Sequence, residues 1–152
     1  MRRLIEVSRP VLWVNTIGTT VIGMWLAGEL WTWSIVPILL WVSFPFNLLI
    51  YGINDIYDQD TDSDNDRKGG YGGAKIKPHE TKMIGWGVIA TNVPFFAYFA
   101  LTLPPAAVAW MAAYALFFWQ YSATPLRLKG RPILDSVSNA DYAFPLVFVP
   151  LA

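Results

Sequence analysis

Long uncharged stretches are the feature of this sequence that most restricts its fold. A membrane-spanning helix needs roughly 20 apolar residues to cross about 30 Å of hydrocarbon. We expect four such spans, at residues 11–28, 34–53, 83–103 and 105–122. A fifth begins near Pro132 to Asp135 and is still apolar at Ala152, so we expect the chain to be truncated within it. The pattern predicts an all-α fold, a polytopic transmembrane helix bundle in a single membrane domain, residues 1–152.

Composition and charge support this prediction. The chain is 55% hydrophobic and only 14% charged, which is too apolar for an average soluble domain. All eleven Lys and Arg residues fall before the first expected span, between the second and third, or between the fourth and fifth. Because basic residues collect in cytoplasmic loops, we expect a multi-pass protein of the cell membrane whose N-terminus is cytoplasmic. The zero net charge gives no argument for a nucleic-acid partner, and the absence of cysteine excludes a thiolate metal site.

An aspartate-rich segment follows the second expected span directly, on the cytoplasmic side. Six aspartates fall within the twelve residues from Asp55 to Asp66. If the helix continues, Asp55, Asp58 and Asp62 share one face, where like charges repel unless a cation lies between them. Carboxylate oxygens suit Mg²⁺, which is commonly held by one or two carboxylates together with substrate phosphates. The spacing therefore predicts a divalent metal site.

Two other interpretations of this segment are weaker. A calcium-binding loop needs glycine at its sixth position and glutamate at its twelfth, where this chain has Ser63 and Gly69. A solvated acidic loop is the ordinary explanation of a charge run. However, Asn54 and Asp55 adjoin a span of bilayer length, where ionisable groups are costly enough to indicate function.

Cations accompany the aspartates on the same side of the membrane. Arg67 and Lys68 follow them immediately, and Arg127 and Lys129 lie in the loop between the fourth and fifth spans. Ordinary anchoring of the spans explains the second loop equally well when that loop is taken alone. Guanidinium and ammonium groups also bind phosphate. Beside the carboxylates, the four cations indicate a diphosphate-binding site.

Four further polar residues are candidates for a substrate pocket. Asn139 lies inside the apolar run of the fifth span and needs a partner there. Asp135 lies four residues earlier, although it also suits a helix N-cap. Asn15 lies in the first span, where a structural hydrogen bond between helices is an alternative. Tyr121 ends the fourth span and completes the set.

Several motifs carry a resemblance to a known family. The pattern Asn54-Asp55-x-x-Asp58-x-x-x-Asp62 resembles the first aspartate-rich motif of the UbiA superfamily of intramembrane prenyltransferases. Ser8-Arg9-Pro10 and Tyr121-Ser-x-x-Pro125-x-Arg127-x-Lys129 are also similar to that family. The extended forms, Asp66-Arg67-Lys68-Gly69-Gly70 and Arg131-Pro132-x-x-Asp135-Ser-x-Ser-Asn139, look most like the lycopene elongase branch, which makes C50 carotenoids.

The resemblance implies Mg²⁺-dependent transfer of a prenyl group from an allylic diphosphate to a hydrophobic acceptor, here lycopene. It implies that Asn54, Asp55, Asp58 and Asp62 are catalytic and that the three aspartates bind Mg²⁺. It also implies a nine-helix bundle with a second aspartate-rich loop between spans six and seven. That loop is missing from this sequence, and Asp135 and Asp141 do not replace it. We therefore expect this piece alone to be weak or inactive unless a partner chain supplies the missing helices.

Other functions remain open at this point. Relatives in the superfamily prenylate aromatic acids, quinone precursors and other lipids, and the sequence does not select among these acceptors. A non-catalytic half-bundle subunit or remnant is a second alternative. A transporter whose ion path is lined by Asn15, Asn54, Asp55 and Asn139 is a third, but transport predicts acidic residues near the bilayer midplane, whereas here they gather at one surface.

Overall fold

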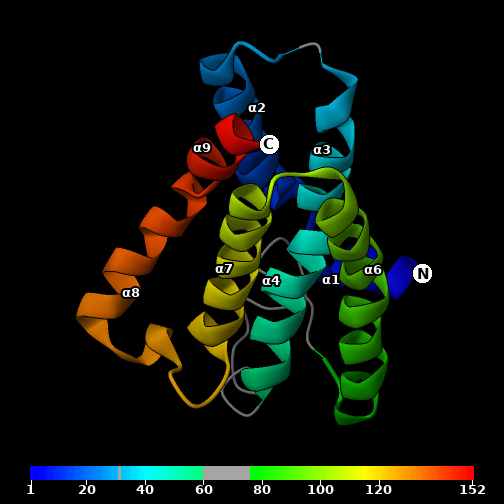
Figure 1. Ribbon diagram of the computed structural model, residues 1–152. Helices are drawn as coiled ribbons and strands as arrows, with labels where there is room; N and C mark the ends of the chain where they lie inside the picture. Colours follow the sequence, from blue (N-terminus) through cyan, green and yellow to red (C-terminus); the bar gives the residue numbers. More distant parts are fainter. Residues whose placement is uncertain (31, 60–75) are drawn as a thin grey trace.

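The computed structural model describes residues 1–30, 32–59 and 76–152, and these residues form helices without any strand (Figure 1). The α-helices are α1 (Arg2–Val7), α2 (Trp13–Ala27), α3 (Val36–Val42), α4 (Phe44–Tyr57), α6 (Thr81–Thr102), α7 (Pro105–Ser122), α8 (Pro132–Ser138) and α9 (Pro145–Phe148). The 3-10 helices are η1 (Pro10–Leu12), η2 (Trp33–Ile35), η3 (Pro78–Glu80), η4 (Leu128–Gly130), η5 (Asn139–Ala143) and η6 (Val149–Leu151).

Three helical stretches are long and apolar enough to cross a membrane. They are Pro10–Ala27, Val36–Tyr57 and Pro78–Thr102, judged by length and composition over the described residues. They coincide with the first three expected spans, and the predicted all-α helix bundle is confirmed. The fourth expected span is a single helix, α7, of 18 residues. The fifth is divided into α8, η5, α9 and η6, so the fourth and fifth membrane crossings stay predictions.

Proline explains why the second span is interrupted. α3 ends at Val42 and α4 begins at Phe44, with Pro45 in the first turn of α4. Because proline lacks an N–H, Pro45 cannot donate to the carbonyl of Trp41, four residues before it. The buried side chain of Asn47 bridges the break, since its Nδ2 donates to the carbonyls of Val42 at 2.8 Å and Ser43 at 2.7 Å. Internal satisfaction of this kind is what membrane helices require.

α4 occupies the middle of the bundle, where it packs against both α6 and α7 (Figure 1). The core beside it is aromatic, and the fully buried indole of Trp41 is its centre. Rings from four elements surround that indole with centroids 4.8–6.5 Å away; they belong to Phe46, Phe96, Phe99, Tyr114 and Phe148. Edge-on and tilted aromatic contacts of this kind add to the packing of apolar surface.

α2, the first long helix, packs closely on α9 near the end of the sequence (Figure 1). A Cβ atom added at Gly23 of α2 would lie only 2.8 Å from the backbone oxygen of Pro145 in α9. Small residues at such points let membrane helices approach closely.

A matched pair of substitutions tests this contact. Gly23→Ala should lower the melting temperature of the detergent-solubilised complete protein by an amount that corresponds to about 1–3 kcal/mol, the usual cost of overpacking. Gly18→Ala, on the same helix, meets no atom within 4 Å and should leave the melting temperature unchanged or slightly raised. Equal melting temperatures for the two variants would contradict the close approach of α2 and α9.

Candidate functional site

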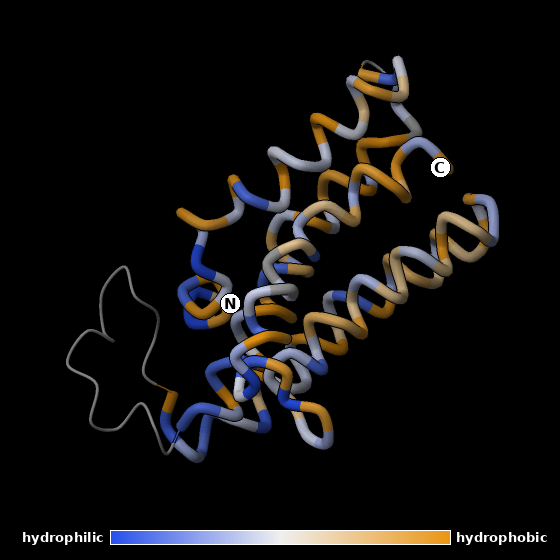
Figure 2. Tube along the Cα trace, turned by 90° about the vertical axis from the view of Figure 1, so that its left-hand side faces the viewer, coloured by the Kyte–Doolittle hydropathy of each residue, from blue (hydrophilic) through white to orange (hydrophobic). Residues whose placement is uncertain are grey.

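Hydrophilic residues gather at one end of the bundle, where α4 ends and α6 begins (Figure 2). α7 ends on the same side (Figure 1), and η4 follows it close to the last turn of α4, while α8 packs against η4. The chain therefore brings the start of the aspartate-rich segment and the basic loop after α7 to one place.

The last turn of α4 presents polar side chains in two directions. Asp58 caps the helix, and its backbone N–H donates to the carbonyl of Asn54 at 3.1 Å. Residues four apart lie on one face of a helix, and the side chains of Asn54 and Asp58 accordingly share one partner, Lys129. Asp55 points to a different neighbour and has a side chain only 1% exposed.

Lys129 of η4 joins the two loops. Its Nζ donates to Oδ1 of Asp58 at 2.6 Å and to Oδ1 of Asn54 at 3.1 Å, with 14% of its side chain exposed. Ser122, at the end of α7, donates from Oγ to the same Asn54 oxygen at 3.1 Å. Arg127 lies farther out, with Nη2 3.6 Å from Oδ1 of Asp58 and a side chain 47% exposed. A strong, partly buried charge pair at Asp58 is thus flanked by a solvent-exposed cation.

Arg9 forms the second charge pair of the site. Its Nη2 donates to Oδ1 of Asp55 at 2.6 Å, and only 15% of the arginine side chain is exposed. The guanidinium carbon also lies 4.6 Å from the ring centroid of Tyr51, a cation–π distance. The backbone of Arg9 is left-handed, with φ of 52°, a conformation that costs a non-glycine residue about 1–2 kcal/mol. The buried pair holds Arg9 in that conformation.

A cavity of about 190 Å³ opens between these groups. Its lining residues come from the N-terminal segment, α4, α7, α8 and η5, and they are Arg9, Ile50, Tyr51, Asn54, Phe118, Tyr121, Ser138 and Tyr142. Tyr121 also donates from its hydroxyl to Oδ1 of Asp135 at 2.7 Å, which joins the end of α7 to α8. The lining therefore combines the guanidinium of Arg9 and the amide of Asn54 with four aromatic rings.

Most of the predicted site residues that the structure describes come together here. Asn54 and Tyr121 line the cavity, and Asp135 accepts a hydrogen bond from Tyr121. The charge pairs of the site contain Asp55, Asp58, Arg127 and Lys129. Asn15 does not, because its side chain is exposed on α2 and does not line the cavity. Asn139 lies in η5 beside the lining residue Ser138, but its side chain is outside what the structure describes.

Part of the predicted site lies outside the described residues, which exclude the predicted metal ligand Asp62 and the predicted diphosphate-binding residues Arg67 and Lys68. Within residues 1–30, 32–59 and 76–152, no group of three or more histidine, cysteine, aspartate or glutamate side chains is placed to hold a metal ion. The predicted ligand trio therefore stays a prediction.

Arg9 and Ser122 contact the site but were not among the predicted site residues. Ser8-Arg9-Pro10 carried a signal for Arg9 as part of the family resemblance. A basic residue before a span also fits simple anchoring, so the sequence alone did not distinguish the two roles. Nothing in the local sequence marks Ser122, because its partner Asn54 lies 68 residues away.

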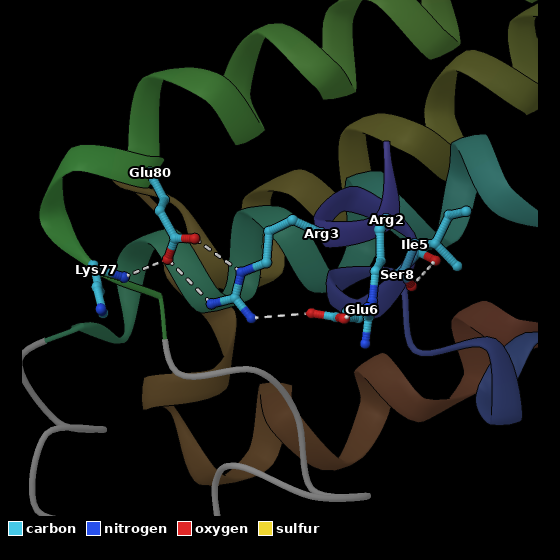
Figure 3. A network of polar contacts seen from close by, with 7 residues as sticks. All are labelled: Arg2, Arg3, Ile5, Glu6, Ser8, Lys77 and Glu80. Carbon is cyan, nitrogen blue, oxygen red and sulfur yellow. Dashed lines mark hydrogen bonds and ion pairs between the residues drawn. The ribbon is translucent and has the colours of Figure 1, made fainter.

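Ion pairs and apolar contacts hold the N-terminal helix α1 against the start of α6. They thereby position Arg9, which follows α1, beside the site. Figure 3 shows Arg3 between Glu80 and Glu6. Arg3 donates to both carboxylate oxygens of Glu80, at 2.9 and 3.1 Å, and to Glu6 at 3.4 Å. The hydrogen bonds to Glu80 raise the pKa of the Arg3 guanidinium above its usual value. Val7 is fully buried in a small core with Leu48, Ile84 and Val88, so α1 holds its position by both packing and charge.

The apolar helices and the charged site at one end define a multi-pass membrane protein with a polar cavity at the bundle end. The chain belongs to the UbiA prenyltransferase family, whose model matches residues 16–151. No solved structure matches the chain.

The similar curated proteins are carotenoid-biosynthesis proteins. A lycopene elongase/hydratase of Halobacterium salinarum is 34% identical over 95% of this chain and 52% of its own length. The C(50) beta-cyclic carotenoids biosynthesis protein LbtBC of a Dietzia species is 38% identical over 88% of this chain and 31% of its own length. A lycopene elongase/hydratase of Haloarcula japonica is 33% identical over 93% of this chain and 49% of its own length. The chain thus spans about half the length, or less, of these relatives.

Proposed function

We propose that the complete protein containing this sequence transfers a prenyl group from an allylic diphosphate to lycopene, in a Mg²⁺-dependent reaction. The observation that carries the proposal is the meeting of Asn54 and Asp58, at the end of α4, with Lys129 from η4, next to a cavity that Asn54 lines together with aromatic rings. Oxygen donors beside cations suit a metal diphosphate, and the rings suit the apolar group attached to it.

The oxygen donors present fit a hard divalent cation. Asn54, Asp55 and Asp58 lie within five consecutive residues at the end of one helix, and Mg²⁺ prefers such ligands together with substrate phosphate oxygens. We propose that Asp55 and Asp58 hold the ion with Asp62. A bound metal ion would neutralise the negative charge of the diphosphate and so make it a better leaving group.

The cations of this chain would bind the diphosphate itself. Lys129 already lies beside Asp58, and the more exposed Arg127 is the nearest further cation. We propose that both, with Arg67 and Lys68, donate hydrogen bonds to phosphate oxygens. Donors aimed at charge that develops on a leaving group lower the barrier to its departure. In this way the basic loop after α7 acts on the group bound at the end of α4.

The aromatic side of the cavity would hold the prenyl chain and exclude water. Phe118 and Tyr142 line it with ring centroids 5.3 Å apart, and Tyr51 and Tyr121 complete the wall. Aromatic faces attract cations, so these rings favour a short-lived allylic cation over its hydrolysis. Asn15, Asp135 and Asn139 remain proposed pocket residues. We also propose that this end of the bundle faces the cytoplasm at the cell membrane, because the basic residues of the chain gather there.

A prenyl-transfer assay tests the proposal. Membranes that contain the complete protein are given Mg²⁺, dimethylallyl diphosphate and lycopene, and both diphosphate and carotenoids are measured. We expect a carotenoid lengthened by five or ten carbons, and neither product when EDTA is present. Diphosphate release with an aromatic acceptor but not with lycopene would overturn the choice of acceptor. No release with any acceptor would favour a non-catalytic membrane subunit.

A further inference from the structure

Asp141 is a buried carboxylate that the diphosphate site does not use. It lies in η5 and is only 4% exposed. Ser138, one turn earlier, and Tyr142, the next residue, both line the cavity. Asp55 and Asp58 are ion-paired with Arg9 and with Lys129, respectively. None of the ion pairs among the described residues involves Asp141, so this carboxylate stands apart from the cations of the site.

Oδ2 of Asp141 and the hydroxyl oxygen of Tyr114 are among the buried polar atoms that have no hydrogen-bond partner among the described residues. The two residues lie within electrostatic range of each other. Burying a polar group without a hydrogen bond costs about 1–3 kcal/mol, and more for a charged group. Asp141 lies in the predicted fifth span, and a carboxylate at such a position indicates a function by default.

The surroundings of Asp141 are aromatic rather than basic. Tyr114 stacks on Phe144 with ring centroids 5.3 Å apart, and Phe118 meets Tyr142 edge-on at the same distance. Such rings stabilise a carbocation in the adjoining space. The chain therefore offers carboxylates in two environments, one set beside cations at the bundle end and one deeper among aromatic rings. Carboxylates in such different environments commonly take different catalytic roles.

The proposed transfer leaves one proton to be removed. The C–O bond of the allylic diphosphate breaks and its electron pair leaves on the diphosphate. The π electrons of the acceptor's terminal double bond then form the new C–C bond and leave a tertiary carbocation on the acceptor. Either a neighbouring C–H bond gives its electrons to a new double bond, or water adds through its oxygen. Both alternative final steps release one proton. The products are the lengthened acceptor, diphosphate and that proton.

We propose that Asp141 is the general base that accepts this proton. The proposal rests on the proposed prenyl transfer and adds the residue that ends it. Asp141 lies three residues after Ser138 and directly before Tyr142, which both line the cavity, so its carboxylate lies next to the cavity wall. Asp55 and Asp58 are instead paired with cations and proposed as metal ligands. General base catalysis by a positioned side chain contributes roughly 10²–10⁴-fold to a rate.

The complete protein with Asp141→Asn tests the assignment. Diphosphate release and lengthened carotenoid are measured in the same samples, with Mg²⁺, dimethylallyl diphosphate and lycopene. We expect Asp141→Asn to release diphosphate but to form at least about tenfold less carotenoid for each diphosphate released. A cation that keeps its proton breaks the new C–C bond again, and water then captures the freed allylic cation as prenyl alcohol. Asp141→Glu should restore part of the ratio because it restores a base. Glu29→Gln, at an exposed carboxylate between α2 and α3, should match the wild type.

Three results would overturn the inference. Asp141→Asn with the wild-type ratio and rate would show that Asp141 takes no proton. A melting temperature well below that of the wild type would indicate a structural role, because asparagine should instead relieve the cost of a partnerless buried charge. A wild type that releases no diphosphate would overturn the proposed function and this inference together. If the wild type is active, a failure in the Asp141→Asn samples concerns this inference alone.

Discussion

Replacing Lys129 with methionine should slow diphosphate release by the complete protein by about 10²–10³-fold, the usual cost of losing one preorganised donor to developing negative charge. Lys129 Nζ lies 2.6 Å from Asp58 and 3.1 Å from Asn54, in a position only 14% exposed. Methionine keeps the length and apolar stem of lysine but removes the charge. The initial rate of diphosphate release at saturating Mg²⁺ measures the effect.

Two further variants distinguish the effect of the position of Lys129 from the effect of the total charge of its loop. Arg131→Met removes a cation two residues away, on an exposed side chain, and should change the rate by less than about threefold because exposed charges act weakly. Lys129→Arg keeps the charge and should retain part of the activity. If Arg131→Met slows release as much as Lys129→Met does, the loop acts only through its overall charge and the placement of Lys129 has no special role.

The positions of the long helices could be predicted from the sequence because bilayer-length apolar runs allow few other structures. The breaks within them were harder to predict. Pro45 explains why the helix is interrupted near this position, but it does not indicate the partner at the break, the side chain of Asn47, which donates to the carbonyls of Val42 and Ser43. Likewise the interruption of the fifth span into short helices reflects Pro145 and Pro150 together with polar residues inside an apolar run. Such outcomes follow from partners in space, which a linear pattern does not contain.

The sequence predicted which chemical groups form the candidate site better than it predicted which carboxylate pairs with which cation. The aspartates were found because their spacing is unusual next to a span. The pairs formed by Asp58 with Lys129 and by Asp55 with Arg9 join residues 71 and 46 positions apart. Helical periodicity suggested that Asp55 and Asp58 act together on one face, whereas each has its own cation here. Only the arrangement of α4, η4 and the N-terminal segment decides which cation meets which carboxylate.

Replacing Arg9 with leucine should lower the melting temperature of the complete protein, by an amount that corresponds to about 3–5 kcal/mol, because it removes one partner of a buried ion pair. The side chains of Arg9 and Asp55 are 15% and 1% exposed, with 2.6 Å between Nη2 and Oδ1. Arg2→Leu is the matched control. The Arg2 side chain is 95% exposed, so its pair with Glu6 should add nothing measurable to stability.

The double variant Arg9→Leu with Asp55→Leu separates stability from chemistry. An apolar pair of similar volume often replaces a buried ion pair at no cost, so the double variant should melt closer to the wild type than Arg9→Leu does. It should nevertheless release no diphosphate, because it lacks one proposed metal ligand. If the double variant is active, Asp55 serves only to partner Arg9 and is not a ligand. If Arg9→Leu melts like the wild type, the pair contributes nothing to stability, and the left-handed backbone of Arg9 must be held by packing alone.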